Sequence, residues 1–257
     1  MNNLFDMSSK VALVTGSTKG IGKAIAERMA EHGAKVVVSS RKADLCDEVA
    51  ASINDSCQAE VAVAIPCNIS NKEELQNLVA KTLEKWGRID ALVCNAAVNP
   101  FFGSSADIPD DAFDKIMSVN IKSNLWLANM VLPQMVERRD GTITIVSSIG
   151  GIKGSRNLGA YGLSKAADFQ MARNLAVEYG GHNIRANAIA PGLIKTNFAR
   201  ALWDNPDILK AATSGAPLLR IGMPDEIAGA AVFLASPAGA FMTGQALVID
   251  GGVTIAE

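Results

Sequence analysis

Short apolar runs alternate with longer amphipathic stretches along the chain. The apolar runs are rich in β-branched residues and predict seven strands, at residues 10–15, 35–40, 61–66, 91–95, 142–147, 185–190 and 246–250. Because these runs are continuously apolar, both faces of the strands must be covered by other elements. The stretches between them repeat their apolar residues with a helical period and predict helices near residues 21–31, 43–53, 72–85, 114–138, 161–179 and 224–235.

Repeated strand–helix–strand units with right-handed crossovers build one parallel sheet with helices on both faces. We therefore expect a three-layer α/β fold with a single doubly wound parallel sheet of about seven strands. No composition shift, linker, repeat or low-complexity tract divides the chain, so residues 1–257 are predicted to form a single domain. Residues 191–223 contain three prolines and little periodicity, and we expect them to form an irregular substrate lid.

The composition narrows the class of partner. The chain has 257 residues, of which 49% are hydrophobic, so it can bury a core without disulfides or structural metal. Lysine and arginine number 24 and aspartate and glutamate 26, with no block of like charge, so neither nucleic acid nor an anionic membrane is expected as a partner. Neither a signal peptide nor an apolar stretch long enough to span a bilayer is visible in the sequence.

The cysteines and histidines of the sequence predict neither disulfides nor a metal site. The cysteines are irregularly spaced and form no C-x-x-C motif, which is typical of reduced thiols in a cytoplasmic protein; they are Cys46, Cys57, Cys67 and Cys94. His32 and His182 have no histidine or cysteine at metal-ligand spacing, so we expect no metal site.

A glycine-rich turn follows the first predicted strand and opens the first predicted helix. Glycines at such a turn let backbone N–H groups and the helix N-terminus approach a pyrophosphate. The candidate phosphate-binding residues are Gly16, Ser17, Thr18, Lys19, Gly20, Ile21 and Gly22. A glycine cluster is a weak signal by itself, because any tight strand-to-helix turn can use one.

The end of the second strand bears on the choice of nucleotide. An acidic residue about 20 positions after the glycines would bind the adenosine ribose hydroxyls, but this chain has Ser40-Arg41-Lys42 there. Arg41 and Lys19 could pair with a 2′-phosphate, and Ser40 could donate a hydrogen bond to it. The sequence thus favours NADP(H) over NAD(H). The alternative is that Arg41 and Lys42 merely open a solvated helix.

A phenol and an amine four positions apart are the candidate chemical groups. Tyr161 and Lys165 lie on one face of a predicted helix, where the ammonium would stabilise the phenolate and make it a usable acid or base. An exposed, solvated pair is the alternative. Ser147 and Ser148 end the preceding strand, and only one of them can reach the same pocket, because neighbouring strand residues face opposite ways.

Together with the glycine spacing and the Tyr-x-x-x-Lys pair, several further segments resemble the short-chain dehydrogenase/reductase family over nearly the whole chain. They are Cys94-Asn95-Ala96-Ala97, Ser118-Val119-Asn120, Pro191-Gly192-Leu193-Ile194-Lys195-Thr196 and Asp250-Gly251-Gly252. The resemblance implies a three-layer Rossmann fold and a homotetramer joined through the helices near residues 114–138 and 161–179.

The resemblance also implies roles for individual residues. It favours Ser148 as the catalytic serine, with Ser147 as a strand-end residue, and it implies that Asn120 holds a water linked to Lys165. For the cofactor, it implies contacts from Asn68 and Ile69 to the adenine, from Asn95 and Ala96 to the nicotinamide ribose, and from the Ile194 backbone and the Thr196 hydroxyl to the carboxamide. Pro191 and Gly192 of the same motif are also expected to bind the cofactor. Cys94 and Ala97 depart from the family's asparagine and glycine, and alanine disfavours a positive φ at position 97.

A closer likeness, through residues 39–42, 95–103 and 190–196, is to the NADPH-dependent carbonyl and retinal reductases of the dehydrogenase/reductase member 4 type. It implies reversible hydride transfer between NADP(H) and a small-molecule ketone, aldehyde or secondary alcohol, with Ser148 binding the carbonyl oxygen and Tyr161 donating the proton. Apolar residues in the loops expected around the pocket suit an apolar carbonyl compound, namely Phe101, Phe102, Leu158, Leu193 and Trp203. The alternatives are a 3-oxoacyl thioester reductase and, in another class, a non-catalytic nucleotide-binding regulatory protein.

Overall fold

All seven predicted strands lie in one parallel sheet in the computed structural model, which describes residues 3–256. The strands are β1 (Val11–Thr15), β2 (Lys35–Ser39), β3 (Ala62–Ala64), β4 (Ala91–Cys94), β5 (Gly141–Val146), β6 (Ile184–Pro191) and β7 (Ala246–Ile249). Their order across the sheet is β3-β2-β1-β4-β5-β6-β7. The doubly wound Rossmann-like sheet is therefore confirmed, with a shorter β3 at its edge than the sequence predicts.

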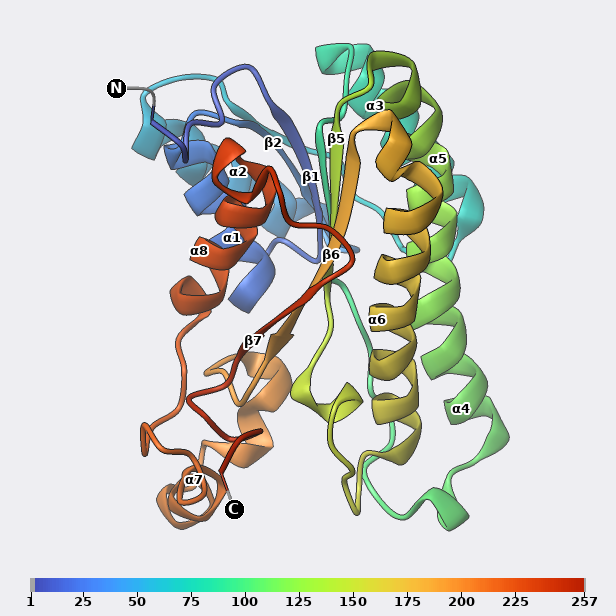
Figure 1. Cartoon of the computed structure of the whole chain (residues 1–257). Helices are drawn as coiled ribbons and strands as arrows, with labels where there is room; N and C mark the ends of the chain where they lie inside the picture. Colours follow the sequence, from blue (N-terminus) through green and yellow to red (C-terminus); the bar gives the residue numbers. More distant parts are fainter. Residues whose placement is uncertain (1–2, 257) are drawn as a thin grey trace.

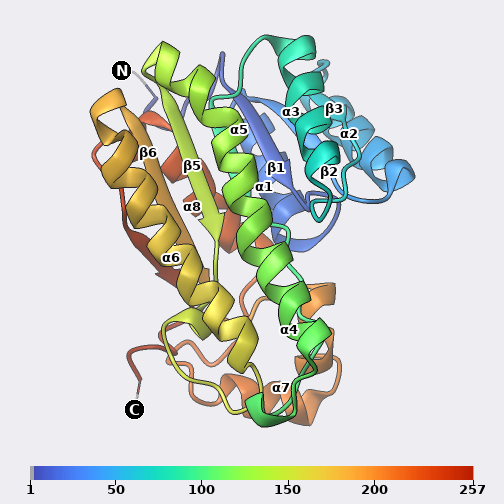
Figure 2. The same cartoon turned by 90° about the vertical axis from the view of Figure 1, so that its right-hand side faces the viewer.

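Helices cover both faces of this sheet (Figures 1 and 2). On one face lie α1 (Gly20–Glu31), α2 (Ala43–Cys57) and α8 (Pro224–Ala235), and on the other lie α3 (Lys72–Trp86), α5 (Ser123–Arg138) and α6 (Gly159–Tyr179). Two shorter helices, α4 (Asp110–Met117) and α7 (Pro206–Thr213), lie toward the carboxyl ends of the strands.

Alternate residues of each strand enter different halves of the core. Ala12 and Val14 pack with α1, α2 and α8, whereas Leu13 and Val37 pack with α3, α5 and α6. All four side chains are fully buried. This double covering is the physical reason why the strands have continuously apolar sequences.

The helix predicted over residues 114–138 is interrupted. It begins earlier, at Asp110 after Pro109, and α4 is joined to α5 by a π-helical turn over Ser118–Lys122. A π-helical turn accommodates one extra residue, and such turns occur often at functional sites. Here the turn carries Asn120, whose side chain bonds to the backbone of Val98 through both its amide oxygen and its amide nitrogen, at 2.8 and 3.0 Å.

The predicted lid is more regular than expected. Residues 191–223 include a 3₁₀ helix over Asn197–Leu202 and the helix α7. Asn205 caps α7 by accepting hydrogen bonds from the backbone N–H groups of Asp207 and Ile208, and Pro206 occupies the first turn. An N-cap asparagine followed by proline is a helix-start signal, so the prediction of an irregular segment was wrong there.

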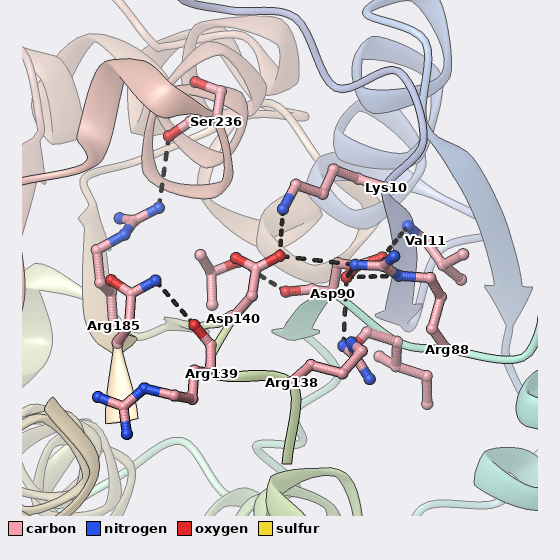
Figure 3. A network of polar contacts seen from close by, with 12 residues as sticks. Lys10, Val11, Arg88, Asp90, Arg138, Arg139, Asp140, Arg185 and Ser236 are labelled. Carbon is pink, nitrogen blue, oxygen red and sulfur yellow. Dashed lines mark hydrogen bonds and ion pairs between the residues drawn. The ribbon is translucent and has the colours of Figure 1, made fainter. Parts of the chain in front are cut away.

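The amino ends of the strands are held by a polar network (Figure 3). Asp90, which is 3% exposed, accepts hydrogen bonds from the backbone N–H of Val11 at 2.8 Å and from Nε of Arg88 at 2.9 Å. Arg138 donates to the same carboxylate at 3.2 Å, and Asp140 pairs with Lys10. The network joins β1 to the start of β4 and β5 and leaves the opposite end of the sheet free for binding.

Candidate active site

A large cavity lies where the strand order reverses. The chain crosses from β1 to β2 on one side and from β4 to β5 on the other, so a crevice opens at the carboxyl ends of β1 and β4. A cavity of about 630 Å³ occupies this place and is lined by Val146 of β5, by Pro191 of β6 and by the segments that follow strands β1 to β6. Its size is that of a small-molecule or cofactor site.

Glycines shape the phosphate end of the cavity. Gly16 and Gly20 have φ values of +66° and +53°, which side chains rarely adopt. A Cβ on Gly22 would lie 2.4 Å from Nδ2 of Asn95, so no larger residue fits there. Asn95 in turn donates to the carbonyl of Thr15 at 2.9 Å and thereby ties β4 to the turn. The glycine-rich turn over residues 16–22, called the glycine cradle below, is thus formed by close packing that only glycine allows.

The residues between these glycines divide into two groups. Lys19, Gly20, Ile21 and Gly22 line the cavity with Gly16. Ser17 does not, since it is fully buried and its Oγ donates to the carbonyl of Val14 at 2.7 Å while accepting from the backbone N–H of Ser39 at 2.8 Å. Thr18 is also outside the lining. Ser17 therefore braces β1 against β2, and its hydroxyl is not available to a ligand.

The charged residues in the cavity lining are all basic. Ser40 and Arg41 follow β2 and lie in its wall with Lys19, and Asn68 and Ile69 lie in the wall after β3. Lysines and arginine supply all the formally charged groups of the lining, namely Lys19, Arg41, Lys115, Lys153 and Lys165. Among residues 3–256, no aspartate or glutamate lines this cavity. The electrostatics of the crevice thus suit an anionic ligand.

The structure separates the two candidate serines. Ser147 is buried, and its Oγ donates to the backbone carbonyl of Lys165 at 2.7 Å. Ser148 lines the cavity, and its Oγ accepts from the backbone N–H of Gly150 at 3.0 Å. Its hydroxyl hydrogen is not used in that bond and can be donated to a ligand oxygen. Both serines are in the cavity lining, but the Ser147 hydroxyl is used by the backbone of Lys165, which leaves Ser148 as the serine whose hydroxyl can donate to a ligand.

Tyr161 and Lys165 lie together in the wall of the cavity. Both line the cavity, and Nζ of Lys165 is 5.7 Å from the centroid of the Tyr161 ring. Lys165 is 2% exposed, so the pair is not a solvated surface pair. Glycine makes this arrangement possible, because a Cβ on Gly151 would lie 2.5 Å from the backbone of Lys165. The loop after β5 therefore packs directly onto α6.

Lys165 has a charged neighbour that sequence reasoning missed. Its Nζ donates to the carbonyl of Val146 at 2.9 Å and to Oδ2 of Asp168 at 3.0 Å. Burial alone would lower the pKa of Lys165, but the carboxylate of Asp168 and the neighbouring Tyr161 outweigh it and raise the pKa above its ordinary value. Burial raises the pKa of the Asp168 carboxyl against the opposing effect of Lys165. The signal in the sequence was the spacing, since Tyr161, Lys165 and Asp168 follow one helix face.

Asn120 is placed behind the cavity rather than in its wall. Its two amide N–H groups are used by the carbonyl of Val98 and by Oγ of Ser164, each at 3.0 Å. Ser164 in turn donates to the carbonyl of Tyr161 at 2.8 Å. In this structure the Asn120 side chain therefore fixes the π-helical turn to α6, close to the tyrosine.

The segment after β6 closes the nicotinamide end predicted by the resemblance. Pro191, Gly192, Ile194 and Thr196 line the cavity, as do Asn95 and Ala96. Ile194 is bridged to Gly222, which fixes the two ends of the lid to each other. Ala97 also lies in the wall, and it is not among the residues of the described chain with positive φ, so its departure from glycine causes no strain.

The apolar substrate wall differs from the prediction. Leu158 and Leu193 line the cavity, but Phe101, Phe102 and Trp203 do not. The Trp203 indole N–H donates to the carbonyl of Thr196 at 2.8 Å, so this ring braces the lid. The missing apolar surface comes instead from the 3₁₀ helix of the lid, through Phe198, Ala199 and Leu202. The Phe198 ring lies 6.0 Å from the Tyr161 ring, centroid to centroid.

Neither a metal-binding cluster nor a membrane-spanning helix is found among residues 3–256. Residues 3–256 contain no group of three or more histidine, cysteine, aspartate or glutamate side chains that could hold a metal ion. None of the helices in the same range is long and apolar enough to cross a membrane.

The doubly wound sheet, the glycine cradle and the serine–tyrosine–lysine group define a nucleotide-dependent oxidoreductase of the Rossmann type. The family model described as "Enoyl-(Acyl carrier protein) reductase" matches residues 16–254. The chain belongs to the short-chain dehydrogenase/reductase family, whose members use a nicotinamide cofactor, and it is an NAD(P)-dependent oxidoreductase.

Among curated proteins, the chain is similar to dehydrogenase/reductase SDR family member 4. It is 42% identical to the *Bos taurus* protein over 246 residues, which are 96% of this chain and 88% of that protein. The *Homo sapiens* protein is 40% identical over the same share of each chain. The chain thus spans most of the length of these relatives.

Solved structures agree with this assignment. A putative gluconate dehydrogenase from *Agrobacterium tumefaciens* superposes with a TM-score of 0.95 at 27% identity, covering 100% of each chain. The active-site complex of *Pseudomonas aeruginosa* RhlG with NADP superposes with a TM-score of 0.92 at 32% identity, covering 99% of this chain and 100% of that one.

Proposed function

We propose that this protein is an NADP(H)-dependent carbonyl reductase that interconverts an apolar ketone or aldehyde and the corresponding alcohol. The observation that carries the proposal is that Ser148, Tyr161 and Lys165 line the same cavity as the glycine cradle and Arg41. A nucleotide held at its phosphate end by the cradle would therefore have its reactive end beside an acid and a hydrogen-bond donor.

Ser148, Tyr161 and Lys165 have different roles in the proposed carbonyl reduction. When bound, the dihydronicotinamide supplies a hydride to the carbonyl carbon. Ser148 donates a hydrogen bond to the carbonyl oxygen and orients it, and Tyr161 donates the proton that this oxygen takes up. Lys165 stabilises the phenolate left on Tyr161 and binds the nicotinamide ribose. In the oxidation direction, the same phenolate accepts the proton of the alcohol.

The preference for NADP(H) is supported by charge. Arg41 and Lys19 lie in the cavity wall beside Ser40, and no carboxylate among residues 3–256 stands where it would repel a 2′-phosphate. Two similar proteins support the same preference, because RhlG and a gluconate 5-dehydrogenase from Burkholderia cenocepacia have been solved in complex with NADP.

The preference for an apolar substrate is supported by the lid. Leu158, Leu193, Phe198 and Leu202 contribute apolar surface to the cavity, and the Phe198 ring lies against Tyr161. An apolar carbonyl compound would bury its surface against them. A 3-oxoacyl thioester is the second candidate, because Lys115 and Lys153 in the same lining would suit the phosphates of its carrier.

We also propose a homotetramer built partly on α5 and α6. Leu125 on α5 and Leu163 and Val177 on α6 are 42%, 61% and 85% exposed, which leaves apolar surface open on the outer face of this helix pair. Covering it with a second copy of the chain is consistent with the interface that the family resemblance implies. Light scattering at micromolar concentration tests this, and a stable monomer would contradict it.

The decisive assay follows nicotinamide absorbance with NADPH and a panel of free ketones, aldehydes and 3-oxoacyl thioesters. We expect turnover of apolar ketones that is abolished in Tyr161→Phe and preserved in Tyr179→Phe, the matched control on the same helix. A strong preference for thioesters would favour the second candidate. Tight NADPH binding without turnover of any compound would instead indicate the nucleotide-binding regulatory protein.

A further inference from the structure

A buried carboxylate lies beside the lysine of the active site, and the reaction scheme above does not use it. Asp168 follows Lys165 by three positions on α6, and the two side chains form an ion pair of 3.0 Å. Lys165 is 2% exposed and Asp168 is 0% exposed. A buried ion pair is costly to desolvate, so its presence next to the reacting groups requires a reason beyond stability.

The groups around the pair come from its own helix, α6, and from three other elements, α5, β4 and β5. Nδ2 of Asn124, on α5, lies 3.5 Å from Oδ1 of Asp168, and the carbonyl of Val146, on β5, accepts from Lys165. The titratable groups facing the pair are Tyr161 on α6 and the Cys94 thiol on β4. Burial, followed by the charge of Asp168, raises the pKa of Cys94, which is therefore a neutral thiol. Within residues 3–256, Lys165 is the only cation in ion-pair contact with Asp168.

Two of the three N–H groups of the Lys165 ammonium have partners in the protein. An ammonium has three N–H groups, of which one is used by Val146 and one by Asp168. Lys165 lines the cavity, whereas Asp168 does not. The carboxylate therefore binds the ammonium on the side away from the cavity and leaves the third N–H group for a ligand.

We propose that Asp168 is a positioning residue that acts through Lys165: it keeps the amine protonated in a site closed to solvent and aims its free N–H group at the cavity. This inference rests on the proposed reaction for its functional meaning. The negative charge also offsets part of the field of Lys165 at Tyr161.

The sign of the effect follows from electrostatics. A negative charge favours the protonated form of every titratable group near it. Replacing Asp168 by asparagine removes that charge but keeps an oxygen that can accept from Lys165. Lys165, whose amine is 3.0 Å from the carboxylate, should then lose its proton at lower pH by about one unit or more, and Tyr161, which lies seven residues from Asp168 on α6, by a smaller amount.

The experiment uses the two tyrosines of the chain. In a Tyr179→Phe background, the ultraviolet absorbance of the phenolate reports Tyr161 alone, with Tyr179→Phe/Tyr161→Phe as the blank. We expect Asp168→Asn to move the midpoint of this titration to lower pH, because the variant removes the negative charge that offsets Lys165. Asp225→Asn, which removes an exposed carboxylate on α8, is the matched control and should leave the midpoint in place. No substrate is needed, so the result is independent of the proposed reaction.

The pH dependence of catalysis tests whether Asp168 also affects the reaction. The pH profile of kcat/KM for the best alcohol and ketone should shift to lower pH on both limbs in Asp168→Asn. A folded Asp168→Asn protein with an unchanged Tyr161 midpoint would overturn the proposal and reduce Asp168 to a structural residue. Should that variant not fold, Asp168→Ser, which is uncharged and smaller, decides the same question. A shifted midpoint with no turnover of any substrate would uphold the electrostatic role and refute the proposed reaction instead.

Discussion

Arg41→Ala tests the nucleotide preference most directly. Arg41 lies in the cavity wall directly after Ser40 and has no ion-pair partner within residues 3–256. Its guanidinium is therefore free to bind a 2′-phosphate, and removing it should weaken NADPH far more than NADH.

The size of the effect follows from the exposure of Arg41. A charge-assisted hydrogen bond contributes about 1.5 to 3 kcal/mol, which corresponds to about 10- to 150-fold in affinity. Arg41 is exposed, so solvent screens the interaction and the lower end applies. We expect kcat/KM for NADPH to fall by about tenfold and that for NADH by less than about twofold.

The assay measures kcat/KM for both nucleotides with one saturating ketone. Lys42→Ala is the matched control, because Lys42 is the neighbouring basic residue, is also exposed and does not line the cavity. Added salt should reduce the difference between Arg41→Ala and the wild type, since it screens an exposed charge pair. Equal losses for NADPH and NADH, or an equal loss in Lys42→Ala, would show that Arg41 does not bind the phosphate.

Three further predictions concern the cradle, the lid and the stability of the sheet. Gly22→Ala places a Cβ 2.4 Å from Nδ2 of Asn95 and should weaken nucleotide binding by about tenfold or more in a fluorescence titration, whereas Gly229→Ala, with open space around it, should not. Phe198→Ala should raise KM for apolar ketones about tenfold and leave KM for NADPH unchanged; equal changes in both would place the ring outside the substrate wall. Asp90→Ala removes a buried carboxylate from two arginines at the amino ends of the strands, so urea denaturation should show a loss of about 3 kcal/mol or more in unfolding free energy; a loss below about 1 kcal/mol would contradict this.

The sheet was predictable because its cause is local. Each strand is a short apolar run such as residues 35–40, and each crossover is a stretch with helical period, so the alternation alone implies a doubly wound parallel sheet. The glycine turn was predictable as a tight strand-to-helix turn for a similar reason, although its use as a phosphate site needed the other motifs of the chain as support. Departures arose where a local signal was overlooked, as with the Asn205-Pro206 start of α7.

The site was only partly predictable, because its assembly depends on contacts between distant segments. From the residues alone, Ser147 and Ser148 were equivalent, and the structure separates them by the bond from Ser147 to the backbone of α6. Phe198 enters the substrate wall because the lid folds back over Tyr161. No periodicity in the sequence contains that information.

The sequence by itself determined the order of elements, the glycine cradle and the presence of a serine, a tyrosine and a lysine. Only the tertiary structure decided which side chains face the cavity, that Arg41 is free of acidic neighbours, and that Asp168 lies 3.0 Å from Lys165. The physical reason is that helix and strand formation depends on residues close together in the sequence. Burial and charge pairing depend instead on how helices and loops from the whole chain pack around one crevice.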